Sequence, residues 1–445
     1  MRAKIVTAAD AAKLIKDGST VATAGFLGIG YAEDVTWHIE QRFLNERKPE
    51  GITLVHAAGQ YSIGHFAHKG LLKRVIAGFY GWSKEMQRLA LSGEIEAYNL
   101  PQGVIINLYR DIAARRKEHV SRVGYGTFVE HEGGAINDRS YYDLVYLKEG
   151  TDLCYRTFPI DVAIIRATTA DISGNLTMEE EALTGEALSL AMAARNSGGI
   201  VIAQVKKFWN GRADPFKVKV PGIFVDYLVE GALPRHKQTP ATSFNVAFMG
   251  QGAKSAFHSP PMEDSVKVRI GKRAADELKE GDIVNIGIGI PELVAQVARE
   301  RGMDEKVTMT TEAGIIGGVP ASGLDFGAAI NMDAVIDPGY QFDFYSGGGL
   351  DCAFLGFAQI DTMGNVNVSK FNGRLPGCGG FIDISQNAKR LVFCGLEEAN
   401  GVSKFVDNVE HITFSAKYAL HRKTPVLYVT DKAVYKLTDK GLVQC

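Results

Sequence analysis

The chain has 445 residues, of which 46% are hydrophobic and 22% are charged, a composition typical of a globular protein with two or three domains. Its 49 basic and 51 acidic residues give a net charge of −2, so no general attraction to nucleic acid or to an anionic membrane is expected. The 49 glycines are more than usual for this length, and they predict many loops in which the backbone takes a positive φ or approaches a ligand closely.

The cysteines and the hydropathy indicate the compartment. Five cysteines are scattered along the chain without a CxxC pair, which indicates free thiols, a reducing environment and no structural zinc. Residues 1–18 lack an apolar core of signal-peptide length, and no apolar run is long enough to span a bilayer. His65 and His68 have no evident third ligand, so they do not predict a metal site. We therefore expect a cytoplasmic protein with no membrane partner and no metal.

Short apolar runs alternate with amphipathic stretches along the whole chain. In chain order, the predicted elements are helices at 9–16 and 34–46, strands at 52–55 and 162–165, a helix at 186–195, a strand at 199–202, a helix at 273–279, a strand at 283–286, a helix at 292–301, and strands at 391–393 and 426–429. Continuous apolar strands between helices are typical of parallel sheets covered on both faces. The sequence therefore predicts an α/β protein.

An internal repeat divides the chain. The segment 11–18 matches 274–281, then 171–177 matches 361–367 through a shared Asp-x-x-Gly-Asn, and 196–201 matches 387–392. Asp-x-x-Gly-Asn is also a common turn, but the ordered set of matches indicates two homologous domains. We place the first domain at 1–235, a proline-containing linker with little periodicity at 236–264, and the second domain at 265–445.

One carboxylate stands alone in a glycine-rich turn. Glu312 follows the β-branched run 307–311 and precedes the glycine-rich stretch 313–318, with no other acid, His or Cys within six residues. An isolated carboxylate fits a nucleophile or a ligand-facing group, since an acid/base pair needs a second member. A carboxylate that caps nearby amides is the alternative. The repeat pairs Glu312 with Pro101, so we expect one such acid per chain.

Three glycine-rich segments accompany this acid. The segment 287–292 follows a predicted strand and opens a predicted helix, where amides can approach an anionic ligand, although it departs from the GxGxxG pattern of dinucleotide sites. The loops 345–351 and 376–381 can present paired amides to a developing oxyanion, or form ordinary turns. The acidic run 179–181 is expected to be a solvated helix start.

The stretch 311–320 resembles the glutamate signature of family I CoA transferases. Similarity to the acetate/propionate CoA-transferase branch extends over 323–328, 341–351, 364–369 and 377–387, and in the first half over 70–74, 98–103, 124–128 and 220–227. The resemblance covers nearly the whole chain and implies two homologous open-sheet CoA-transferase domains. Where the branch often has Gly-His-Trp, this chain has Gly78-Phe79-Tyr80, a departure that concerns acyl and acceptor specificity.

The resemblance also implies a reaction and a site. Glu312 would attack an acyl-CoA, and a glutamyl-CoA thioester would then pass CoA to a free short-chain carboxylate in a ping-pong reaction. By motif position, Gly287, Ile288, Gly289, Ile290 and Pro291 would lie along CoA, Gly380 would polarise the thioester carbonyl, and Gln102 and Gly348 are further substrate-binding candidates. CoA is then a substrate, with no permanently bound cofactor, and a homo-oligomer is expected. The alternatives are a short-chain acyl-CoA hydrolase that uses the same glutamate and a non-catalytic metabolite-binding α/β module.

Overall fold

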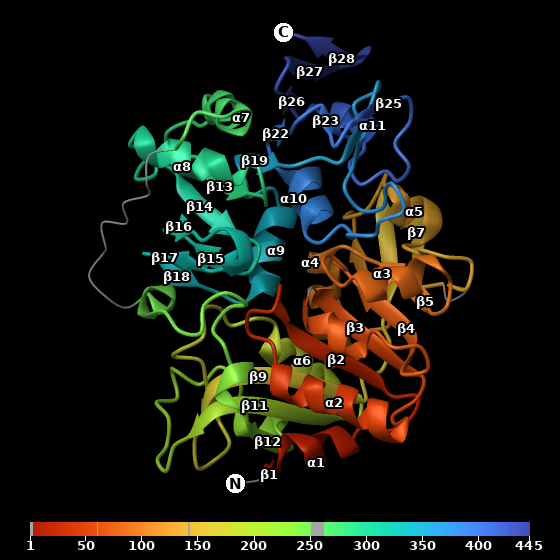
Figure 1. Cartoon of the computed structure of the whole chain (residues 1–445), viewed down its shortest axis with the longest axis vertical. Coiled ribbons are helices and arrows are strands. Elements are labelled where there is room, and N and C mark those ends of the chain that lie inside the picture. Colours follow the sequence, from red (N-terminus) through yellow and green to blue (C-terminus); the bar gives the residue numbers. More distant parts are fainter. Residues whose placement is uncertain (1–2, 60, 141–142, 251–261) are drawn as a thin grey trace.

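Two large sheets form the frame of the computed structural model, which describes residues 3–59, 61–140, 143–250 and 262–445 (Figure 1). Over these residues the first sheet has the order β1-β12-β11-β9-β2-β3-β4-β5, with β10 paired to β9, and the second has the order β18-β15-β14-β13-β19-β22-β26-β27-β28. In Figure 1 the first sheet lies below the second, and the two meet through helices.

The strands of the first sheet are β1 (Lys4–Ile5), β2 (Thr20–Phe26), β3 (Ile52–Ala58), β4 (Leu72–Ala77), β5 (Glu96–Asn99), β9 (Val162–Ala170), β10 (Leu176–Thr177), β11 (Ile200–Phe208) and β12 (Tyr227–Glu230). Those of the second are β13 (Ile283–Ile286), β14 (Thr308–Thr311), β15 (Ile315–Ile316), β18 (Ala334–Val335), β19 (Cys352–Leu355), β22 (Leu391–Cys394), β26 (Val426–Val429), β27 (Val434–Thr438) and β28 (Gly441–Gln444). Small sheets are made by β6 (Glu118–Ser121), β7 (Val145–Glu149) and β8 (Asp152–Arg156); β16 (Val319–Pro320) and β17 (Ala329–Ile330); β20 (Gln359–Asp361), β21 (Val366–Asn367) and β25 (Phe405–Val406); and β23 (Glu398–Ala399) and β24 (Val402–Ser403).

Helices cover both faces of each large sheet. They are α1 (Ala8–Lys13), α2 (Glu33–Glu46), α3 (Lys84–Leu91), α4 (Gln102–Ala113), α5 (Phe128–Glu132), α6 (Ala187–Asn196), α7 (Val266–Ala275), α8 (Glu292–Glu300), α9 (Pro338–Ser346), α10 (Phe381–Asn387) and α11 (Ala416–His421). Helices α1 to α3 pack on the outer face of the first sheet, and α7 and α8 on the outer face of the second. The inner helices α4 and α6 share one continuous core with α9 and α10, which joins the two halves (Figure 1).

The two sheets contain the same five-stranded parallel core. The order β12-β11-β9-β2-β3 in the first sheet corresponds to β26-β22-β19-β13-β14 in the second, and every pair within both sets is parallel. The repeated Asp-x-x-Gly-Asn turns also have the same hydrogen bonds. Asp171 accepts the backbone amides of Ser173 and Asn175, and Asp361 accepts those of Met363 and Asn365. The predicted α/β fold with two homologous halves is confirmed.

The sheet order corrects the predicted partner of Glu312. This residue directly follows β14, and β14 occupies in the second sheet the place that β3 occupies in the first. Pro101 instead follows β5, at the far end of the first sheet, so its pairing with Glu312 is wrong. The topological counterpart of Glu312 is Gly59, the residue after β3. The first half therefore has no carboxylate at this place.

Most predicted helices and strands agree closely with the structure: the helices predicted at 34–46, 186–195 and 292–301 match α2, α6 and α8 to within one residue at each end, whereas the strands β9 and β11 are longer than predicted. The strands predicted at 283–286 and 426–429 have the bounds of β13 and β26, whereas the helix predicted at 273–279 overlaps only the end of α7. That helix starts at Val266 because the hydroxyl of Ser265 accepts the amide of Val268 at 3.3 Å, a capping contact. The prediction for 179–181 is wrong, since Glu181 is buried and pairs with Arg166 at 2.9 Å.

The linker and the domain bounds at 235 and 265 stay a prediction. Residues 251–261 of this linker lie outside the described part of the chain. Before them, the 3-10 helix η4 (Val246–Met249) places Phe248 in an apolar cluster between the halves, together with Phe26, Leu27 and Phe326. Among the described helices, none combines the length and the apolar character that crossing a bilayer requires.

Candidate active site

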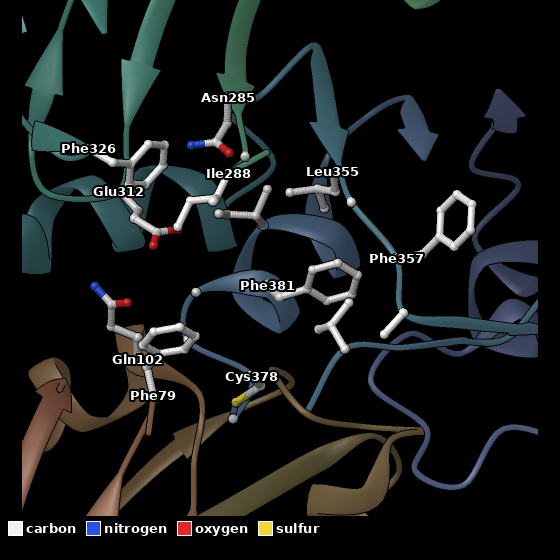
Figure 2. A pocket seen from close by; sticks show the side chains of 18 of the residues that line it. Phe79, Gln102, Asn285, Ile288, Glu312, Phe326, Leu355, Phe357, Cys378 and Phe381 are labelled. Atoms are coloured by element: carbon white, nitrogen blue, oxygen red, sulfur yellow. The ribbon is translucent and has the colours of Figure 1, made fainter. Parts of the chain in front are cut away.

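Glu312 faces a cavity of about 300 Å³ that is lined by residues of both halves (Figure 2). The first half contributes Leu27, Phe79 and Gln102, and the second half contributes the remainder of the lining, from Asn285 to Ile384. Most of the lining is apolar, so a carboxylate in this cavity has few polar neighbours. The cavity is therefore suited to an apolar chain with one reactive polar group.

The chain delivers Glu312 to this cavity by a sharp turn. Strand β14 ends at Thr311, and the backbone reverses at Gly314 to enter the antiparallel strand β15. Gly314 has φ +101°, and a Cβ there would lie 2.1 Å from the carbonyl oxygen of Ile336. Only glycine fits this position without a backbone shift. The glycine-rich sequence after Glu312 thus serves the turn that points the carboxylate out of the sheet.

The glycine loop 377–380 of the second half passes beside Glu312 and is hydrogen-bonded to the first half. The amide of Gly379 donates to the carbonyl of Gly78 at 2.7 Å, and the amide of Gln102 donates to the carbonyl of Gly379 at 2.9 Å. The side-chain oxygen of Asn99 accepts the amide of Cys378 at 3.0 Å. Two loops of the first half therefore fix the glycine loop 377–380 by direct hydrogen bonds.

Gly380 ends this loop beside the carboxylate. It caps α10 with an ordinary φ of −83°, and a Cβ there would lie 2.5 Å from Oε2 of Glu312. Its amide donates to no residue in the described part of the chain. An unused amide next to a reactive group can stabilise charge on a carbonyl oxygen that reacts there.

The environment of Glu312 makes its charge costly. Burial raises the pKa of Glu312 from 4.5 to about 7. No described side chain or amide hydrogen-bonds its carboxylate. The hydroxyl of Tyr345 donates instead to the hydroxyl of Thr310, two residues before Glu312, at 2.7 Å. Asn285 also lines the cavity, and its Oδ1 has no partner among the described residues. A poorly solvated carboxylate that ionises near neutral pH is a competent nucleophile.

A second acid lies close by, which sequence reasoning missed. Asp383 is buried in α10, and its Oδ2 accepts the amide of Gly103 at 3.2 Å. Burial raises the pKa of Asp383 well above its usual range, and the charge of Glu312 acts in the same direction. One signal was present: an aspartate inside the apolar run Phe381–Ile384 must be buried or paired.

Residues 5–231 and 267–442 match the family described as Coenzyme A transferase. The chain belongs to this family.

Relatives cover nearly the whole chain. It is similar to a caffeate CoA-transferase of Acetobacterium woodii, with 40% identity over 98% of this chain and 90% of the relative, and to the acetate CoA-transferase YdiF of Escherichia coli K12, with 35% identity over 99% and 88%. The crystal structure of the E. coli O157:H7 acyl-CoA transferase YdiF, as a thioester complex with CoA, aligns with a TM-score of 0.90 and 34% identity over 100% of this chain and 90% of that one. These findings support a CoA-transferase, and neither a hydrolase nor a non-catalytic binding module.

In this CoA transferase, several predicted site residues meet at one cavity. Glu312, Gln102, Gly287, Ile288 and Gly380 all line it. Gly289, Ile290 and Pro291 are not among its lining residues; they continue the turn into α8, where the amide of Gly289 donates to the Glu292 carboxylate at 2.6 Å. Gly348 lines a separate cavity of about 480 Å³, together with Arg122 and Arg422. The structure thus brings together the glutamate, the glutamine and Gly380, but leaves Gly348 apart.

The side chains of His65 and His68 both contact the carboxylate of Glu40. Nδ1 of His65 and Nε2 of His68 lie 2.6 Å and 2.7 Å from the two carboxylate oxygens of Glu40. Within the described ranges no group of three or more His, Cys, Asp or Glu side chains is arranged to hold a metal ion.

Proposed function

We propose that this CoA transferase moves CoA between a short-chain acyl-CoA and a free carboxylate through a glutamyl-CoA thioester on Glu312. One observation carries the proposal: the Glu312 carboxylate has no hydrogen-bond partner in the described part of the chain, and it lies against Gly380 in a cavity shared by both halves. The similarity to an acetate CoA-transferase, and to a YdiF crystal structure that is a thioester complex with CoA, supports it.

The reaction begins with the ionised glutamate. An oxygen of Glu312 attacks the thioester carbonyl of acyl-CoA, the C–S bond breaks, and an acyl-glutamyl anhydride and CoA thiolate result. The thiolate then attacks the glutamyl carbonyl, which releases the free carboxylate and leaves glutamyl-CoA. An acceptor carboxylate reverses both steps, so no water and no permanently bound cofactor take part. The Gly380 amide would stabilise the oxyanion that forms in these steps.

The cavity offers a path for CoA. Ile288, Leu355 and Phe357 lie along the wall of the cavity that leads away from Glu312 (Figure 2). Gly287 and Gly356 also line the cavity. We assign this wall to the pantetheine arm, with the turn 289–291 beyond it. The opposite wall, with Gln102 and Phe79 from the first half, would hold the acyl group and the acceptor.

Replacement of Glu312 tests the proposal. Glu312→Gln keeps the size of the side chain but removes the nucleophile, so transfer should fall to background. Incubation of the unmodified enzyme with acyl-CoA, followed by borohydride or hydroxylamine, should modify Glu312 alone in a peptide mass map. Normal turnover by Glu312→Gln, or modification of a different residue, would overturn the assignment.

An assay without an acceptor separates transfer from hydrolysis. With acyl-CoA alone, the enzyme should release at most one equivalent of free acid per site and then stop. Addition of acetate or propionate should restore steady turnover. Steady acid release without an acceptor would show that water intercepts the intermediate.

We further propose that the enzyme works in the cytoplasm as a homo-oligomer. All five cysteines are free thiols in the described chain, as expected for a reducing compartment. Trp209 and Phe216 line one surface cavity and expose 52% and 95% of their surface, and an exposed apolar patch suits a contact between copies. Cell fractionation and light scattering during gel filtration would test the two statements separately.

A further inference from the structure

Helix α4 begins at the active site but cannot cap its own first turn. It starts at Gln102, which lines the cavity, and the preceding residue is Pro101, whose side chain makes no capping hydrogen bond. The first amides of a helix have no acceptor within the helix, so a capping group must come from elsewhere.

The capping group comes from the other half of the chain. Oδ2 of Asp383, on α10, accepts the amide of Gly103 at 3.2 Å, the contact that a capping residue makes inside an ordinary helix start. Asp383 is 1% exposed. Gly103 allows its close approach because it has no side chain: a Cβ at Gly103 would lie 2.5 Å from Oδ1 of Asp383 and 2.6 Å from the ring of Phe342. The close approach therefore requires glycine at this position.

Helix α10, with its capping residue, contacts both Glu312 and α4. Its capping residue, Gly380, lies against the Glu312 carboxylate, and Asp383 stands three residues further along. The neighbouring residue of α4, Gln102, is held from its own side by the hydrogen bond to the carbonyl of Gly379. Asp383 and Gly379 thus hold two consecutive amides of α4, and Gln102 is fixed between them.

We propose that Asp383 is a positioning residue, which caps α4 across the interface and thereby fixes Gln102 and the glycine loop 377–380 against Glu312. The inference rests on the proposed function, because Glu312 is the group whose surroundings are being fixed. Asp383 does not reach the reacting atoms in this role. It acts on the placement of Gln102 and Gly380.

The surroundings of Asp383 favour the neutral, protonated form of its carboxyl group. Asp383 is buried near Glu312, and two carboxylates at such a site do not both ionise readily. A protonated Asp383 still offers a carbonyl oxygen to Gly103, so an amide side chain of the same shape can replace it. Glu312 is then left as the ionised member of the pair.

Two variants of Asp383 and one control test the proposal. Asp383→Ala removes the cap, and we expect kcat to fall on the order of 10- to 100-fold, the effect of a small misplacement of reacting groups. Asp383→Asn keeps an oxygen toward Gly103 and should recover most of the kcat. The control is Asp343→Ala, which removes the exposed ion pair of 2.7 Å to Arg110 further along α4 and should leave kcat within about twofold.

A double variant shows whether the effect passes through Gln102. In a Gln102→Ala background, Asp383→Ala should cause a smaller loss of kcat than it causes alone, because the part of its effect that passes through Gln102 is already lost. If Asp383→Ala does not fold, Asp383→Ser takes its place. Its hydroxyl is too short to reach Gly103, so the same loss of kcat is expected.

Several results would overturn the positioning role: a normal kcat for folded Asp383→Ala, equal losses for Asp383→Ala and Asp343→Ala, or no recovery with Asp383→Asn. Glu312→Gln distinguishes this failure from failure of the proposed function. If Glu312→Gln is inactive and Asp383→Ala is fully active, the positioning role alone is wrong. If Glu312→Gln turns over normally, the proposed function itself fails.

Discussion

Gly380 lies so close to Glu312 that a Cβ atom on it would stand 2.5 Å from Oε2 of the carboxylate. The backbone of Gly380 is ordinary, with φ −83° and ψ 2°, so glycine is required here for space and not for conformation. The nearest atom belongs to the flexible end of a side chain, whereas at Gly314 it belongs to the backbone of Ile336. Activity and stability should therefore respond differently at these two glycines.

Gly380→Ala should impair the reaction while the fold persists. The new methyl group would push the Glu312 carboxylate aside, because the side-chain Cδ atom would also lie only 3.0 Å away. A displacement on the order of 1 Å costs roughly 100-fold in rate, so kcat should fall by about that factor. Steady-state kinetics and a thermal melt measure the two effects, and we expect a stability change within about 1 kcal/mol.

Gly64→Ala is the matched control for this substitution. Gly64 lies in the 3-10 helix η1 (Tyr61–Phe66) and is not among the residues that line the cavity, and the nearest atom to its Cβ would be 3.9 Å distant. Its kcat should equal that of the unmodified enzyme. Gly314→Ala, by contrast, should destabilise the protein by roughly 2 kcal/mol or more, because it needs both a positive φ and a backbone shift. A Gly380→Ala variant that keeps full kcat would contradict this account.

The activity should depend on pH through Glu312. Burial raises its pKa to about 7, and only the ionised form attacks a thioester. The kcat/KM for acyl-CoA should therefore rise with pH through about 7 and level off above it, since this parameter reports groups of the free enzyme. A profile that is flat between pH 5.5 and about 8.5 would show that the carboxylate ionises at its ordinary value near 4.5.

Stability should change with pH in the opposite direction. The pKa of Glu312 is about 7 in the folded enzyme and near 4.5 in the unfolded chain, so the folded state binds more protons between these values. The free energy of unfolding loses a contribution as pH rises through this window, and the loss is complete above about 7. Glu312→Gln removes the effect, so its Tm should exceed that of the unmodified enzyme at pH 8 by more than at pH 5. Equal differences at the two pH values would contradict the assignment.

The sequence contains enough to predict the fold class and to single out Glu312 as the candidate nucleophile. Parallel strands leave continuous apolar runs, and the two copies of one repeat unit are visible directly, so the fold class needed no tertiary information. The order of the strands did need it, since that order showed the pairing of Glu312 with Pro101 to be wrong. Glu312 could be found because its signal is local: one carboxylate between a β-branched run and a glycine turn. The start of the helix predicted at 273–279 was wrong. Its capping serine, Ser265, is followed by a stretch rich in Lys and Arg, and these charged residues make the apolar face of α7 hard to recognise in the sequence.

The surroundings of Glu312 could not be predicted in the same way. The hydrogen bond from Gly103 to Asp383 joins residues 280 positions apart, and nothing local marks either residue as part of one site. Local patterns also fail to separate loops of similar composition. Gly348 closes α9, where its amide donates to the carbonyl of Tyr345 at 3.0 Å, whereas Gly380 lines the cavity of Glu312. Only the packing of α4 against α9 and α10 distinguishes the two glycines.

Phe79 should set the size of the acyl group. It stands where the related branch often has a histidine, and it lines the cavity beside Gln102 (Figure 2). A Cβ at Gly379 would lie 3.8 Å from the ring of Phe79 and 3.9 Å from Oε1 of Gln102, so all three share one end of the cavity. Phe79→Ala removes this ring. The ratio of kcat/KM for hexanoyl-CoA to that for acetyl-CoA should rise about 10-fold or more, since each methylene in an apolar pocket is worth 10-fold or more in selectivity.

Phe357→Ala is the matched control for acyl selectivity. Phe357 lines the same cavity but lies across it from Glu312 in Figure 2, on the wall assigned to the pantetheine arm. Every donor carries that arm, so this variant should raise KM for acetyl-CoA and hexanoyl-CoA alike and leave the ratio of their kcat/KM values unchanged. If Phe357→Ala changes the ratio and Phe79→Ala does not, the two walls have been assigned in the wrong order, and the acyl group lies on the side of Phe357.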